Sequence, residues 1–262
     1  GMTNTTGAER RAAGSDVWST LRGIDDPAAV QASVEAFEQA LGPLGSFVID
    51  FALGEVWSRP GLSRRDRSLV TLSVLATINQ QNQLHGHVQG AIRHGLTPAE
   101  IQEICLQLAA YAGFPRAIDA MTTVRAAIQE MEGIEAPSLA PAAPMDDEAR
   151  DAAVADVAGT LFDGSSTAGL EAPLGDFSTA AIRFALGEIW ARPQMARRDR
   201  SLVVCASLAA QNRPDELQIH MTGARRHGAS RAELEELLVM ICVYAGFPSA
   251  VQGFRALRAA LD

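Results

Sequence analysis

The sequence predicts an all-α protein made of two similar domains in tandem. The clearest sign is an internal repeat at a constant offset of 133 residues, as between Phe51 and Phe184. Three segments of the first half return in the second half at this offset: 51–60 as 184–193, 64–70 as 197–203, and 111–115 as 244–248. A repeat of this length is a whole domain rather than one unit of a solenoid.

Composition supports the same fold class. A chain of 262 residues is long enough for two domains, each with its own core. Hydrophobic residues make up 47% of the chain and aromatic residues only 5%, with alanine and leucine dominant and few β-branched runs. This balance favours helices over sheets, and no segment shows the two-residue period of a strand.

Charge and cysteine content narrow the class of protein. The net charge of −9 argues against a nucleic-acid partner, which would require a basic surface. With no apolar run of membrane-spanning length and no signal peptide, we expect no membrane partner and a cytoplasmic location. Cys105, Cys205 and Cys242 form no Cys-x-x-Cys pair and have no equivalents in the other repeat, so we expect core residues and no disulfide framework.

A proline-rich segment divides the chain. Residues 136–144 contain three prolines, which disfavour a helix and indicate an extended linker. We therefore expect a first domain at 15–133, a linker at 134–145 and a second domain at 146–262. The polar residues 1–14 are predicted to be disordered.

Each repeat is predicted to be a series of helices with recognisable ends. In the first repeat, Asp26 and Pro27 open a helix, Ser63 precedes another, Gly95 stops a third, and Thr97 with Glu100 forms a capping box. The expected helices are about 27–41, 47–57, 64–78, 82–94, 98–113 and 115–131.

The second repeat mirrors this order. It has the same glycine stop at Gly228 and a capping box at Ser230 and Glu233. Its beginning differs, because residues 146–162 are predicted to form one helix and residues 164–178, rich in Gly, Ser and Thr, a loop.

The histidines are the candidate catalytic residues. All five lie on the predicted helices 82–94 and 215–227, and His87 and His220 are equivalent. Glu216 stands four residues before His220, so carboxylate and imidazole share a helix face, and the carboxylate would raise the pKa of the ring. Gln83 takes this place before His87; it can orient the ring without supplying charge, and it is a candidate substrate-binding residue. The alternative is a solvated pair on the helix surface.

The remaining histidines suggest simpler roles. His94 and His227 each precede a stopping glycine, where a partly charged imidazole would favour the helix end. His85 has Gln218 as its equivalent and lies on another side of the helix from His87. Because a zinc site needs three or four converging ligands, no metal site is predicted.

Two arginine-rich helix starts are candidate anion-binding segments. One interpretation is a solvated, salt-bridged first turn. The other is that an arginine of each repeat points inward and holds a substrate carboxylate, with Arg65, Arg67, Arg198 and Arg200 as candidates. Glu55 and Glu188, with Trp57 and Trp190, are expected to bracket a structural corner.

These motifs together resemble the carboxymuconolactone decarboxylase family of the alkylhydroperoxidase D-like all-α superfamily. The matching stretches are 197–203, 215–220, 227–234 and 243–248, and the resemblance covers about 47–131 and 180–261. It implies two tandem domains of that fold related by pseudo-two-fold symmetry, and assembly into a homotrimer that imitates the hexameric rings of single-domain relatives.

Two chemistries are known in this superfamily. The hydroperoxidase branch uses a Cys-x-x-Cys pair near the histidine, which is missing around His87 and His220, and Ser68 and Ser201 stand roughly where its assisting acid would be. The decarboxylase branch works without a metal ion or an organic cofactor. The resemblance therefore implies a cofactor-free lyase acting on a small anionic lactone or carboxylic acid from aromatic-compound degradation. In it, His220 with Glu216 would be the proton donor or an electrostatic anchor.

Two further readings stay open at this point: a peroxidase-like oxidoreductase and a non-enzymatic, oligomeric protein that binds small carboxylates. Within the lyase interpretation, the carboxylate beside His220 favours the second-repeat site as the dominant one, with His87 contributing less.

Overall fold

The computed structural model describes residues 4–162 and 174–262, and all regular elements in these ranges are helices. The predicted all-α fold class is thereby confirmed. The first repeat comprises α1 (Gly7–Arg22), α2 (Pro27–Leu41), α3 (Pro43–Phe47), η1 (Val48–Trp57), α4 (Arg64–Thr77), α5 (Gln81–Arg93), α6 (Pro98–Ala109) and α7 (Phe114–Gln129). The second comprises α8 (Asp147–Leu161), α9 (Asp176–Ile182), η2 (Arg183–Trp190), α10 (Arg197–Ala210), α11 (Pro214–Arg226), α12 (Arg231–Tyr244) and α13 (Phe247–Leu261).

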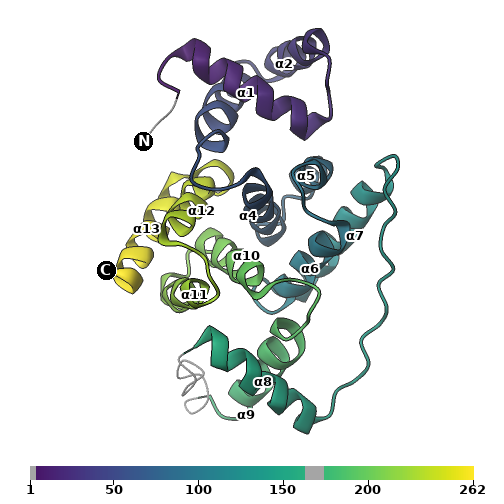
Figure 1. Cartoon of the computed structure of the whole chain (residues 1–262), viewed down its shortest axis with the longest axis vertical. Helices are drawn as coiled ribbons and strands as arrows, with labels where there is room; N and C mark the ends of the chain where they lie inside the picture. The colour runs from purple at the N-terminus through teal and green to yellow at the C-terminus, as the bar shows by residue number, and fades with distance from the viewer. Residues whose placement is uncertain (1–3, 163–173) are drawn as a thin grey trace.

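The molecule is elongated, and its two repeats meet at the centre. Figure 1 shows α1 and α2 at one end, α8 and α9 at the other, and α4 and α10 in the middle. Helix α4 packs on both α10 and α12, while α10 packs on α6. The buried apolar side chains of both repeats form one continuous core, so the repeats share an interior.

Pairs of equivalent residues show the pseudo-two-fold relation. Arg65 Nη2 donates to Asp199 Oδ2 at 2.7 Å, and the equivalent Arg198 Nη2 donates to Asp66 Oδ2 at 2.8 Å. The equivalent leucines Leu69 and Leu202, and Leu75 and Leu208, are all buried. The helices that carry them therefore occupy matching places in the two halves.

The predicted helix ends are largely confirmed. Ser63 caps α4, and both capping boxes form, at Thr97 with Glu100 and at Ser230 with Glu233. Helix α6 ends at Ala109 rather than near Gly113, because residues 110–112 form turns. Between α7 and α8 the chain runs as a helix-free strap along one side of the molecule (Figure 1), and Arg125 Nη1 donates to the Pro137 carbonyl at 3.0 Å.

The prediction of disorder over residues 1–14 is wrong from Gly7 onward. Thr6 caps α1 by accepting from the Glu9 amide, and Arg11 forms ion pairs with Glu38 and Asp50. Gly14 lets α1 approach η1 so closely that a Cβ at this position would lie 1.9 Å from the Ile49 carbonyl oxygen. The sequence of this segment is mostly polar because most of α1 faces solvent and only a narrow side of the helix is buried.

The segments that end at Trp57 and Trp190 are π-helical. The helix predicted at 47–57 begins at Pro43 as α3 and widens into the π-helix η1. The second repeat does the same through α9 and η2, each time after a glycine with φ +60°, Gly42 or Gly175. The predicted loop at 164–178 is therefore too long, because α9 begins at Asp176. The part of that prediction at 164–173 lies outside the described residues.

Among the described helices, none combines the length and the apolar character needed to cross a membrane.

Candidate active site

Each of the two equivalent histidines lies in a cluster built from both repeats. His220 on α11 contacts Trp190 of its own repeat and Tyr111 of the first repeat. His87 on α5 contacts Trp57 of its own repeat and Tyr244 of the second. Each histidine thus contacts a tyrosine of the other repeat. This happens because α6 and α12, at whose C-terminal ends the tyrosines lie, pack against the central helices α10 and α4 of the opposite repeat.

The His220 cluster is closed and internally hydrogen-bonded. Trp190 stacks on the His220 ring with centroids 5.9 Å apart and planes 6° from parallel. Its indole Nε1 donates to the Tyr111 hydroxyl at 2.8 Å, so the Tyr111 hydrogen is free to point at His220 Nε2, 3.3 Å away. His220 is only 8% exposed, and its Nδ1 is buried with no hydrogen-bond partner among the described residues.

The His87 cluster has the same parts but opens into a cavity. Trp57 stacks on His87 with planes 8° apart, and Trp57 Nε1 donates to the Tyr244 hydroxyl at 2.8 Å. The adjoining cavity has a volume of about 530 Å³. Its wall is mostly apolar and comes from α1, α2, α3, η1, α4, α5 and α12. Its polar lining residues are Arg22, Gln80, Gln83, His87 and Tyr244.

A serine–histidine pair lies beside each cluster. Ser68 Oγ is 2.9 Å from His94 Nδ1, and Ser201 Oγ is 2.8 Å from His227 Nδ1. His94 and His227 occupy the C-cap positions, as the sequence suggested, and their rings lie 5.5 and 5.7 Å from Trp57 and Trp190. Each tryptophan ring therefore contacts two histidines of its own repeat.

Burial keeps all four of these imidazoles neutral at physiological pH. Removal from water lowers the pKa of His87, His94, His220 and His227 to about 4 in each case. Arg22 adds a smaller electrostatic lowering of the His87 pKa. The expectation of partly charged caps at His94 and His227 is therefore wrong, because desolvation outweighs the attraction of the helix end.

The predicted pair between Glu216 and His220 does not form. Glu216 is exposed and makes no hydrogen bond or ion pair with a described residue, while His220 Nε2 faces Tyr111. The expected raised pKa of His220 is accordingly a lowered one. Glu216 and His220 do lie on one helix, as their spacing predicted, but the Glu216 carboxylate in the first turn of α11 points into solvent. Gln83 lines the cavity beside His87.

The arginines predicted to hold substrate are instead held by protein carboxylates. Arg67 is fully buried with Glu236, and Arg200 is fully buried with Glu103. Arg65 and Arg198 bridge the two repeats through Asp199 and Asp66. The predicted clamp is therefore not formed, because these guanidiniums already have anionic partners within the fold. Glu55 and Glu188 likewise pair with Arg10 and Arg150.

The cysteines show no sign of a peroxide-reducing dithiol. All three are free, and burial raises the pKa of each thiol, which for Cys105 reaches about 12. Cys105 and Cys205 are core residues as expected, and Cys242 is partly buried against that core. In the described parts of the chain, no three His, Cys, Asp or Glu side chains converge as a metal site would require.

Sequence reasoning missed the aromatic partners of the histidines. Trp57 and Trp190 were assigned to a structural corner, and they are fully buried, but each also stacks on a site histidine. One signal was present in the sequence: both tyrosines of the chain and two of its three tryptophans recur at the repeat offset. Their crossing between repeats could not be derived from it.

Comparisons with known proteins agree with this architecture. The model of the carboxymuconolactone decarboxylase family matches twice, at residues 43–126 and 175–259. The 4-carboxymuconolactone decarboxylase of Acinetobacter baylyi is 43% identical over 76 residues, which are 29% of this chain and 57% of that protein. The nitrosuccinic acid decarboxylase of Metarhizium robertsii is 39% identical over 89 residues, or 34% and 62% of the two chains.

In these two matches the chain spans about six-tenths of the length of each relative. A solved structure from Burkholderia xenovorans LB400, proposed to be a gamma-carboxymuconolactone decarboxylase subunit, aligns over 98% of both chains with a TM-score of 0.56 and 21% identity. That likeness extends the shared fold to the whole tandem arrangement.

Proposed function

Because the chain belongs to the carboxymuconolactone decarboxylase family, we propose that it is a carboxy-lyase that removes CO₂ from a small anionic lactone or carboxylic acid. The observation that carries this proposal is the neutral imidazole of His87, which lines a cavity of about 530 Å³ beside Tyr244 of the other repeat. The relatives named as decarboxylases of carboxymuconolactone and nitrosuccinic acid support the reaction type.

The proposed chemistry uses His87 as a proton carrier. In the empty site the ring is neutral, because burial lowers its pKa to about 4. A bound carboxylate favours the imidazolium, so the substrate enters together with one proton from solvent. When the C–COO⁻ bond breaks, its electron pair passes into the lactone or another adjacent acceptor as an enolate. His87 then protonates the carbon, which leaves CO₂, the product and a neutral ring.

The first-repeat site is the better candidate for turnover. His87 faces the cavity, whereas His220 is nearly inaccessible and its Nε2 is occupied by Tyr111. The carboxylate that would have favoured the second site is turned to solvent. Stacking on Trp57 fixes the plane of the His87 ring, so a proton would be delivered from a defined direction.

The test is a screen of candidate acids, including 4-carboxymuconolactone, nitrosuccinate and related lactones. Turnover would be followed by ultraviolet absorbance and by CO₂ release. With an active substrate, His87→Asn should lower the rate by about 10²–10⁴-fold, the usual loss of general acid–base help. His85→Asn is the matched control, since His85 lies on the same helix and pairs with Glu130 at the surface.

Three outcomes would redirect the assignment. Binding of these acids without CO₂ release would favour a carboxylate-binding protein. Robust thiol-dependent reduction of peroxides would favour an oxidoreductase. A rate loss in His220→Asn that exceeds the loss in His87→Asn would move the active site to the second repeat.

A further inference from the structure

The His87 cavity contains one formal positive charge and no negative one among its described lining residues. The positive charge is Arg22, in the last turn of α1. The other polar lining groups are two glutamine amides, the imidazole and the phenol. In a protein of net charge −9, a cavity that is cationic favours an anionic ligand.

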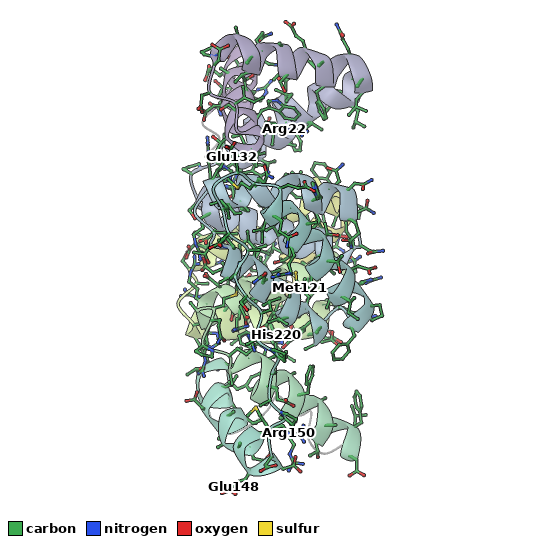
Figure 2. The ribbon with its side chains drawn as sticks, turned by 90° about the vertical axis from the view of Figure 1, so that its right-hand side faces the viewer. Arg22, Met121, Glu132, Glu148, Arg150 and His220 are labelled. Carbon is green, nitrogen blue, oxygen red and sulfur yellow. The ribbon has the colours of Figure 1, made fainter. Side chains whose placement is uncertain are left out.

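Arg22 is positioned but has no anionic partner. Its guanidinium carbon lies 4.4 Å from the centroid of the Trp18 ring, which holds the side chain by a cation–π contact. No hydrogen bond or ion pair joins it to a described residue. Arg11 on the same helix shows the contrast, because it holds both Glu38 and Asp50. Arg22 is an exposed residue, so its donor atoms are accessible to a group that enters the cavity. Figure 2 shows Arg22 in the α1–α2 layer, toward the central helices.

The second repeat lacks this cation. Leu21 packs on Gly90 and Leu161 packs on the equivalent Gly223, so α1 and α8 correspond. Arg93 and Arg226 also donate to the carbonyls of Leu21 and Leu161. The residue that follows is Arg22 in the first repeat and Phe162 in the second.

The other polar positions of the cavity also differ between the repeats. Gln80 and Gln83 of the first site correspond to Arg213 and Glu216, whose charges offset each other. Arg22 also lies outside the residues matched by the family model, so this cation belongs to the N-terminal helix of this chain.

We propose that Arg22 binds a carboxylate of an anionic ligand in the first-repeat cavity and is the residue that makes this site, rather than the second, selective for organic anions. The proposal deepens the proposed function, since the ligand would be the substrate of that same site. Arg22 would hold a carboxylate through its two-pronged guanidinium, while His87 faces the reacting carbon.

The test measures binding of succinate to the full chain by isothermal titration calorimetry, with uncharged succinamide as the matched probe. Succinate is saturated, so binding is read without turnover. Arg22→Gln should weaken succinate binding by about 10- to 100-fold, the loss of a charge-assisted hydrogen-bonded pair. Arg22→Lys should recover part of the affinity. Arg255→Gln, which removes an exposed charge elsewhere, should bind like the unmodified chain.

A second measurement reports the neighbourhood of Arg22 directly. Because the Arg22 charge lowers the His87 pKa, Arg22→Gln should raise the pKa of His87 in an NMR titration, with the signal assigned by its loss in His87→Asn. Circular dichroism of each variant would confirm that it is folded.

The proposal is overturned if the unmodified chain does not bind succinate at millimolar concentration, if Arg22→Gln binds it equally well, or if succinamide follows the same ranking. Binding through Arg22 without decarboxylation of any acid would support this inference and contradict the proposed function. Decarboxylation with the same KM in Arg22→Gln as in the unmodified chain would support the proposed function and contradict this inference.

Discussion

Tyr244, the last residue of α12, accepts the indole N–H of Trp57 at 2.8 Å, and so joins the two repeats inside the His87 site. The equivalent bond from Trp190 to Tyr111 has the same length. Each histidine site therefore depends on both repeats, and the tandem chain supplies within one molecule what two separate domains would have to bring together.

This relationship predicts the effect of removing the hydroxyl. Tyr244→Phe leaves the buried Trp57 N–H without its acceptor, which should cost about 1–3 kcal/mol of unfolding free energy. Urea denaturation measures the loss. Ser33→Ala is the matched control: it also removes an indole acceptor, that of Trp18, but Ser33 is partly exposed and water can replace it. Equal losses in the two variants would contradict the prediction.

Acid should destabilise the fold through its histidines. His87, His94, His220 and His227 have pKa values lowered to about 4, against 6.5 without the fold. Between these values the unfolded chain binds protons that the folded chain does not, so stability is full above pH 6.5 and falls as the pH drops toward 4. At pH 5, unfolding should take up about 0.9 proton per such histidine.

The measurement is the unfolding free energy at several pH values between 4 and 7. His227→Asn should reduce the proton uptake at pH 5 by about 0.9, because one of the linked groups is gone. An unchanged pH dependence in that variant would show that the imidazole is not held neutral by burial.

The buried ion pairs between repeats should be costly to break. Glu103, whose side chain is 3% exposed, accepts from both Arg192 and the fully buried Arg200. Glu103→Ala leaves the Arg200 charge uncompensated and should destabilise the protein by about 3–5 kcal/mol. Glu235→Ala, which breaks an exposed pair with Arg231, should cost about 0–1 kcal/mol. Thermal or urea unfolding of both variants provides the comparison, and a small loss in Glu103→Ala would contradict it.

We expect the chain to assemble as a homotrimer. Large apolar side chains are exposed at equivalent places in the two repeats, with Phe114 at 57% and Phe247 at 60%, beside Ile118 and Val251. Paired exposed patches of this kind indicate a surface that another copy covers. Light scattering should give three times the chain mass of 27.8 kDa, and Phe114→Asp combined with Phe247→Asp should lower it. A monomeric mass at micromolar concentration would exclude the trimer.

Local signals in the sequence were reliable where the cause is local. The caps at Ser63, Thr97 and Ser230 formed because each side chain needs only an amide three residues ahead. The repeat offset likewise identified His87 and His220 as equivalent. The same local reasoning failed for α1, whose order comes from distant partners such as Glu38 and Asp50.

The sequence by itself determined the helical class, the duplication and the helix that carries each site histidine. Periodicity and capping act over a few residues, and the duplication is visible when the two halves of the sequence are compared. Only the tertiary structure decided what surrounds those histidines. In the structure Glu216 is exposed to solvent, Arg67 and Arg200 form ion pairs with buried glutamates, and Tyr244 of the other repeat contacts His87. Burial then set the pKa of each ring, since desolvation depends on what packs around a group and not on its neighbours along the chain.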